Sequence, residues 1–116
     1  MTAAQPAQLQ LNPATLQLGG PQGWIDITDP ECTLLKALAQ SVDSRLDNAD
    51  LLARVGKADD AAAKHALEVQ IVRLRKKLAQ AGATAPTIKA IRGFGYQLCI
   101  SLAVSQSMPQ SIVLSS

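Results

Sequence analysis

Aromatic residues are scarce in this chain of 116 residues, which contains only Trp24, Phe94 and Tyr96. The hydrophobic fraction is nevertheless 47%, so the core has to be filled by Leu, Ile, Val and Ala. A chain of this length is expected to bury roughly two thirds of the surface that it exposes when unfolded. The composition therefore predicts one globular domain with an aliphatic core, and it excludes a chain that is disordered throughout.

Cysteines and long apolar runs are also lacking. Cys32 and Cys99 are too few for a disulfide scaffold, and we interpret both as small core residues in a reducing compartment. No apolar stretch approaches the roughly 20 residues that span a bilayer, and no basic start with an apolar segment marks a signal peptide. These absences predict a cytoplasmic protein that has no membrane partner.

Charge is unevenly distributed, although the formal net charge is only +2. Residues 1–63 carry eight acidic and four basic side chains, and residues 93–116 carry no charged side chain. Residues 64–92 carry seven basic side chains against the single acid Glu68. A basic stripe of this kind on a small domain predicts a polyanionic partner.

Short stretches of alternating apolar and polar residues open the chain, separated by the turn residues Asn12-Pro13 and Gly19-Gly20-Pro21. Period-two alternation is typical of strands, so we predict a small antiparallel sheet from residues 8–11, 15–18 and 24–27. Its buried face is expected to carry Leu9, Leu11, Leu16 and Leu18.

Two helices are predicted next from their start signals. Thr28 and Glu31 form a capping box, in which the side chain of each residue accepts a hydrogen bond from the backbone N–H of the other. The helix that begins there should run to about residue 40. Asp47 is placed to cap a second, shorter helix that ends at Val55, just before Gly56.

The longest helical pattern covers residues 61–81 and stops at Gly82. Its apolar stripe, at helical spacing, consists of Leu67, Ile71, Leu74 and Leu78. At about 100° per residue, the opposite side of this helix displays His65, Val69, Val72, Arg73 and Lys76. Such a strip has about the width that a DNA major groove admits.

Two strand-like runs, residues 87–91 and 96–100, flank the segment Arg92-Gly93-Phe94-Gly95. Both glycines permit a positive φ, so we predict a hairpin with Arg92 at its tip. The expected organisation is a flexible N-terminus (1–7), one domain (8–102) and an uncharged tail (103–116).

Strands, three helices and a terminal hairpin follow each other in the order of a winged helix. Residues 67–78, LEVQIVRLRKKL, resemble the third-helix signature of the OmpR/PhoB-type DNA-binding domain. Residues 88–98, IKAIRGFGYQL, resemble its wing, in which an Arg-Gly-x-Gly-Tyr segment is typical. The resemblance implies an α+β winged helix-turn-helix with a four-stranded N-terminal sheet. It also implies a transcription regulator that binds promoter DNA, often as two copies on direct repeats.

A DNA-binding role assigns specific contacts to the third helix. Arg73 is expected to bind a guanine edge or a phosphate, whereas Lys64 and Lys76 suit phosphates, because an ammonium gives charge without planar geometry. Val69 and Val72 are placed to touch thymine methyl groups.

Two further residues complete the predicted site. His65 is interpreted as a surface polar residue or a phosphate contact, because no second His, nearby Cys or acidic cluster completes a metal site around it. Arg92 is expected to enter the adjacent minor groove, where narrow A·T tracts concentrate negative potential. We predict no cofactor, no metal and no enzymatic activity, since no nucleophile–base pair is visible.

The chain also departs from the family pattern. His65 stands where relatives usually place an arginine, and Val72 where they place a charged or polar residue. Relatives usually carry a receiver domain of a two-component phosphorelay, whereas we expect none before residue 8 here. The loop before the third helix, which contacts RNA polymerase in relatives, is slightly shorter, and its charged residues are Lys57, Asp59 and Asp60. These departures keep a second hypothesis open, a winged-helix protein-interaction module that does not bind DNA.

Overall fold

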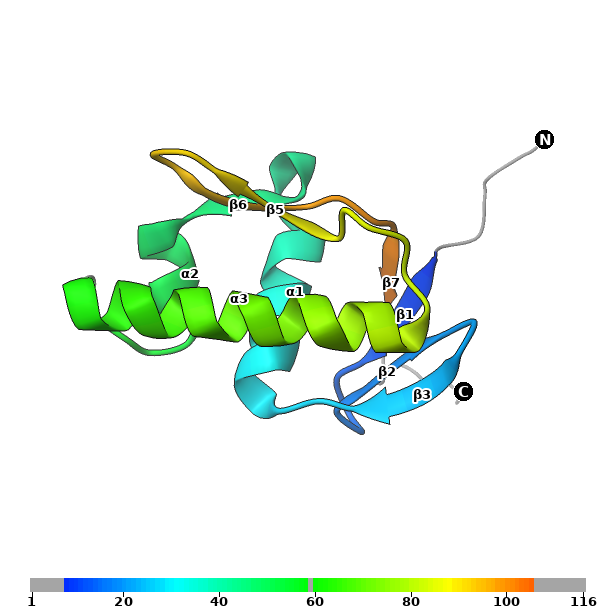
Figure 1. Cartoon of the computed structure of the whole chain (residues 1–116). Helices are drawn as coiled ribbons and strands as arrows, with labels where there is room; N and C mark the ends of the chain where they lie inside the picture. Colours follow the sequence, from blue (N-terminus) through cyan, green and yellow to red (C-terminus); the bar gives the residue numbers. More distant parts are fainter. Residues whose placement is uncertain (1–7, 59, 106–116) are drawn as a thin grey trace, which may run out of the picture.

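The structure is a computed structural model that describes residues 8–58 and 60–105. In Figure 1, the long helix α3 (Ala61–Ala81) runs along one side of the molecule, with a four-stranded sheet at one end and a three-stranded sheet above the helices. α1 (Asp29–Ala39) and α2 (Asn48–Arg54) lie between these layers. The predicted α+β order of a winged helix is confirmed. In the described part of the chain, no helix is long and apolar enough to cross a membrane.

The four-stranded sheet has the strand order β3-β2-β1-β7. Its first three strands pair antiparallel, as predicted, but the fourth comes from the C-terminal side and pairs parallel with β1, with Leu9 opposite Leu102. The strands are β1 (Leu9–Asn12), β2 (Gln17–Gly20), β3 (Gly23–Asp26) and β7 (Leu102–Val104).

The fourth strand corrects two expectations. The sheet is mixed rather than purely antiparallel, and Ala103 and Val104 belong to it, past the expected boundary at residue 102. A strand of three residues is too short for its alternating pattern to be recognised in the sequence. It forms because it pairs with β1, which lies at the other end of the chain. The segments expected to be a flexible N-terminus, 1–7, and the rest of the tail, 106–116, lie outside the described residues.

The inner face of this sheet carries Leu9, Leu11 and Leu18, which are fully buried as predicted. Leu16 is only partly buried, because β2 begins after it and Leu16 sits in the preceding turn with a φ of 53°. Trp24 is 53% exposed and lies across Gly19 on the outer face, where a Cβ on Gly19 would collide with the indole ring.

The helices begin and bury residues as their sequences predict. Thr28 and Glu31 form the capping box of α1, and the carboxylates of Asp47 and Asp60 accept hydrogen bonds from the first turns of α2 and α3. Gly82, with a φ of 108°, ends α3 in a left-handed conformation. The buried leucines and isoleucine of the three helices are Leu34, Leu35, Leu38, Leu51, Leu52, Leu67, Ile71, Leu74 and Leu78.

The C-terminal hairpin forms as predicted, but a third strand joins it. The strand order is β4-β6-β5, with all pairings antiparallel, and the extra strand follows a short 3₁₀ turn at Val42–Ser44. The strands are β4 (Arg45–Asp47), β5 (Ile88–Ile91) and β6 (Gly95–Leu98).

The two glycines of the hairpin have different roles. Gly93 has a φ of 73° and makes the turn, as predicted. Gly95 needs no positive φ; it lies so close to β4 that a Cβ there would collide with the carbonyl oxygen of Leu46. Gly95 therefore allows the third strand to approach, which the sequence did not reveal.

The two cysteines differ in burial. Cys32 is buried in the core as predicted, and burial raises the pKa of its thiol, with Asp29 adding to the shift and Lys36 opposing it. Cys99 is exposed, which corrects the expectation of a core residue. Leu98 and Ile100 turn inward, so the residue between them must face outward.

Candidate nucleic-acid interface

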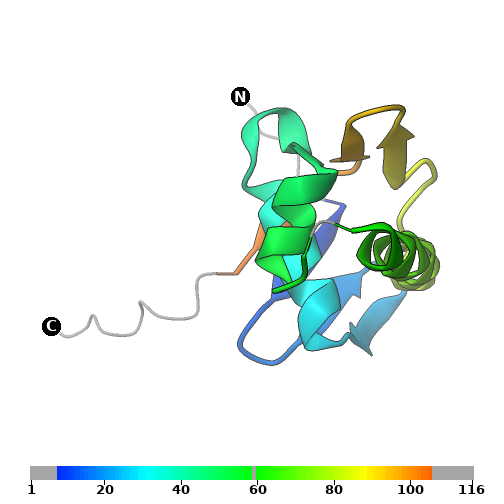
Figure 2. The same ribbon diagram turned by 90° about the vertical axis from the view of Figure 1, so that its left-hand side faces the viewer.

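Among the described residues, no other helix or strand covers the outward side of α3. Val69 is 38% exposed and Val72 is 47% exposed, and the neighbouring polar residues of the strip are exposed as well. Figure 2 looks along α3 and shows this helix and the β5–β6 hairpin together on one side, with no other helix or strand outside them. The strip that the structure brings onto this side consists of His65, Val69, Val72, Arg73 and Lys76.

Arg73 and Lys76 supply positive charge on this strip. Within residues 8–58 and 60–105, neither side chain takes part in a salt bridge or a hydrogen bond. Both border a shallow depression beside Thr28 and Gln80. Their charges are therefore available to an anionic partner without the loss of an internal ion pair.

His65 and Lys64 occupy the first turns of α3 but face different directions. The imidazole Nδ1 of His65 lies 3.7 Å from Oε1 of Glu68, and both side chains are largely exposed. Lys64 is exposed, but it lies about 100° around the helix from His65, so it does not belong to the same strip. Any contact of Lys64 with DNA would therefore be at the edge of the interface.

The wing brings another cation to the same side of the molecule. Arg92 is exposed in the turn between β5 and β6. The backbone next to it is anchored, because the N–H of Asn48 donates to the carbonyl oxygen of Phe94 over 3.0 Å. The Phe94 ring is 38% exposed, and the guanidinium of Arg45 lies 5.4 Å from its centre. Arg45 is thus a cation near the wing tip that the sequence analysis missed, because β4 was not predicted.

Arg75 joins α3 to the wing. Its Nε donates to the carbonyl oxygen of Ile88 in β5 over 2.9 Å, in a partly buried position. Tyr96 of β6 packs nearby: burial raises the pKa of its hydroxyl, Glu68 adds to this and Arg75 opposes it. Arg75 is thus bound within the protein, and the bond links the wing to α3.

Lys77 joins α3 to α1. Its Nζ lies 2.8 Å from Oε1 of Glu31, the same oxygen that accepts the N–H of Thr28 in the capping box. Burial alone would raise the pKa of Glu31, but the hydrogen bonds from Lys77 and Thr28 and the charge of Lys77 outweigh it, so the pKa is lowered. Glu31 therefore remains charged and holds the two helices together.

No cluster of three metal-ligating side chains occurs in the part of the chain that the structure describes. The arrangement is instead that of a binding surface, with an uncovered helix, a neighbouring hairpin and cations at both.

Comparisons with known proteins agree with this arrangement. Residues 22–98 match the family model described as transcriptional regulatory protein, C terminal. The DNA-binding domain of CpxR from E. coli is 28% identical, with a TM-score of 0.69, over 88% of this chain and 97% of that chain.

Two further solved structures share the fold. The DNA-binding domain of E. coli CadC is 23% identical with a TM-score of 0.63, over 82% of this chain and 94% of its own. The DNA-binding domain of AdeR, solved with an intercistronic region, is 17% identical with a TM-score of 0.67, over 82% of this chain and 97% of its own. No curated protein matches the chain in sequence.

Proposed function

The chain belongs to the family of C-terminal domains of transcriptional regulatory proteins and is a sequence-specific DNA-binding regulator, and from this premise we propose how it holds the duplex. α3 enters the major groove with its outward strip. This placement is supported by the observation that the strip is exposed and lies on the same side of the molecule as the wing.

Within the major groove, the side chains of α3 divide into two kinds. Arg73 reads a guanine edge through its planar guanidinium, and Lys76 neutralises a phosphate. Val69 and Val72 contact thymine methyl groups, which suits their exposed apolar surfaces. His65 and Lys64 contact phosphates at the N-terminal end of the helix.

The wing reads the neighbouring minor groove. Arg92 is exposed at the tip, and the tip is anchored to the start of α2 through Asn48. A narrow A·T-rich minor groove attracts arginine through its enhanced negative potential. The domain of AdeR was solved with an intercistronic DNA region, which supports promoter-proximal DNA as the target here.

Partners beyond DNA are also proposed. Two copies bind adjacent sites, because a single small domain contacts too few phosphates and bases to bind tightly. The connection between α2 and α3, with the exposed Lys57 and Asp60, faces away from the hairpin and is available to RNA polymerase. Asp59, also expected there, lies outside the described residues. We also propose a cytoplasmic location for this domain, since that is where bacterial promoter DNA lies.

Selection of bound sequences from a random duplex library at physiological salt tests this function. The expected result is one recurring motif, with a guanine whose selection depends on Arg73 and an A·T-rich flank whose selection depends on Arg92. Affinity for the selected duplex should fall steeply with salt, because phosphate neutralisation releases counterions.

Amide NMR shifts with the selected duplex then locate the interface. Shifts confined to residues 62–78 and 89–96 support the proposal. The absence of a recurring motif, together with a flat salt response, would favour the protein-interaction module, for which the exposed Val69 and Val72 are the specific motivation.

A further inference from the structure

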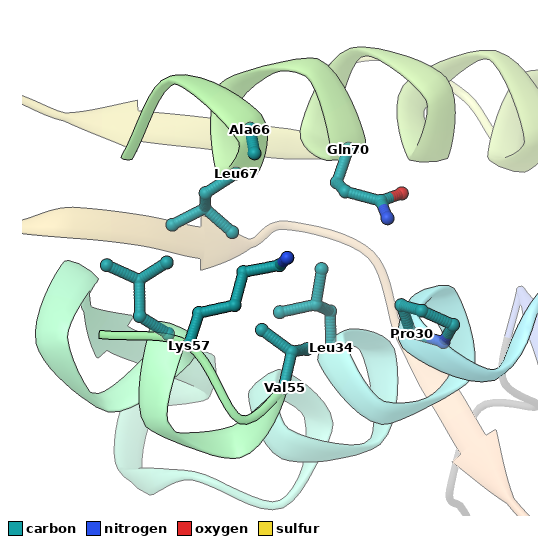
Figure 3. Close-up of a pocket in the computed structure, with 8 residues that line it drawn as sticks. Pro30, Leu34, Val55, Lys57, Ala66, Leu67 and Gln70 are labelled. Carbon is teal, nitrogen blue, oxygen red and sulfur yellow. The ribbon is translucent and has the colours of Figure 1, made fainter. Parts of the chain in front are cut away.

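A partly enclosed pocket lies between the three helices, away from the outward strip of α3. Its volume is about 180 Å³. α1, α2 and α3 each contribute apolar walls, and the loop after α2 closes one side (Figure 3). The lining residues are Pro30, Leu34, Leu52, Val55, Lys57, Ala66, Leu67 and Gln70.

Only two of these residues have polar side chains, and both point into the pocket. Figure 3 shows the Nζ of Lys57 between Leu34 and Leu67, with the amide of Gln70 on the α3 side. The backbone of Lys57 is fixed, because its N–H donates to the carbonyl oxygen of Leu52 over 2.9 Å. The Lys57 side chain therefore starts from a fixed point of the backbone at the edge of the pocket.

The ammonium of Lys57 forms no ion pair with any acidic group of the described residues. None of the eight lining residues is acidic, and the described residues give the Lys57 side chain no salt bridge or hydrogen bond. An ammonium beside apolar walls is complementary to an anionic group attached to an apolar body. The side-chain amide of Gln70 is a second hydrogen-bond donor that lines the pocket.

The volume limits the size of the apolar body. An apolar protein cavity of about 150 Å³ is known to bind benzene, so a pocket of this volume admits one six-membered ring. We propose that this pocket is a binding site for a small apolar monocarboxylate of the size of benzoate. Its ring packs against Leu34, Leu52 and Leu67, and its carboxylate pairs with Lys57.

Titration of the full chain with benzoate, followed by amide NMR shifts, tests this site. The expected result is saturable shifts at the amides that line the pocket. Benzyl alcohol, which keeps the ring without the charge, and acetate, which keeps the charge without the ring, should each bind at least tenfold more weakly. Equal binding of benzyl alcohol would overturn the proposal, because the pocket would then take any apolar group, including a side chain of a protein partner.

Three variants make the test specific. Lys57→Gln removes the ammonium from an exposed position and should weaken benzoate binding about tenfold. Lys89→Gln, which removes an exposed ammonium on β5, should leave it unchanged. Ala66→Leu fills the pocket and should abolish binding, while its native NMR spectrum shows that it folds. Benzoate affinity unchanged by either Lys57→Gln or a folded Ala66→Leu would overturn the site, whatever the result for DNA.

Discussion

On the side of α3 that faces the rest of the protein, Arg75 and Lys77 are bound to the carbonyl of Ile88 and the carboxylate of Glu31. On the outward side, Arg73 and Lys76 make no such bond within the described residues. Four cations within five positions of one helix therefore divide into two that position neighbouring elements and two that are available to a ligand. Side-chain direction, and not residue type, separates the two roles.

This division of the cations of α3 explains how the fold supports the proposed DNA interface. The inward cations fix the wing and α1 against α3, so the outward cations are presented on a rigid surface. Pre-positioned charges lose less conformational entropy on binding than charges on loose elements. Removing an inward cation or its partner should therefore affect stability or geometry, and removing an outward one should affect DNA binding alone.

The largest effect on stability is expected from Glu31→Ala, because Glu31 is the partner of the inward cation Lys77. This change removes the Glu31 half of the capping box and the ion pair to Lys77 together, and should lower the free energy of unfolding by about 2–4 kcal/mol. Urea denaturation measures it. Glu68→Ala, which removes an exposed acid from α3, should change stability by no more than about 0.5 kcal/mol.

Acidification provides an internal check on that prediction. The pKa of Glu31 is lowered below its ordinary value of 4.5, so its stabilising contribution is present above that value and is lost as the pH falls through the folded-state pKa. The stability difference between the wild type and Glu31→Ala should therefore shrink in acid. A difference that stayed constant would contradict the role of the charge.

A smaller effect, on DNA affinity and not on stability, is expected at the outward side of α3. Arg73→Ala should weaken binding to the selected duplex by about 1–3 kcal/mol and relax the preference at one base pair. Its stability should stay within about 0.5 kcal/mol of the wild type. Fluorescence anisotropy on matched and mutated duplexes measures the affinity, with Arg54→Ala as a control for the loss of an exposed arginine. Equal weakening on every sequence would make Arg73 a phosphate contact instead.

The link between the two sides is tested by a double-mutant cycle. If Arg75 positions the wing, Arg75→Gln and Arg92→Ala should not be additive, with a coupling energy of about 0.5–1.5 kcal/mol in DNA binding. A control cycle that combines Lys89→Gln with Arg92→Ala should be additive, because no hydrogen bond joins Lys89 to α3 in the described structure. Additivity in the first cycle would show that the wing keeps its position without Arg75.

The smallest effect is expected where the outward strip lacks charge. His65→Arg should tighten DNA binding a few-fold and steepen the salt dependence by about one counterion, because it adds a phosphate contact on an exposed turn. His65→Gln serves as the control that changes shape without adding charge. Unchanged salt dependence would place His65 outside the interface.

Much of this fold was predictable because its signals are local. The caps at Thr28 and Asp47 and the stop at Gly82 lie within one turn of the residues they affect, so these helix boundaries follow from short segments. The outward strip of α3 was predictable for the same reason, since helical periodicity alone places its members. Its individual contacts with DNA remain predictions.

The missed features all depend on distant partners. β4 and β7 are three-residue strands that exist because β6 and β1 offer them hydrogen bonds. The roles of Gly95 and Arg45 follow from β4, and neither is visible without it. Exposure of Trp24 likewise depends on which face of its sheet the helices cover.

The amino-acid sequence by itself determined the helices, their caps, the hairpin and the cationic side of α3, because backbone hydrogen bonding and side-chain periodicity act over a few residues. Only the tertiary structure decided which cations bind inside the protein and which remain available. It also decided where a pocket with the ammonium of Lys57 opens between the helices. Those outcomes depend on surfaces that meet only when the chain is folded.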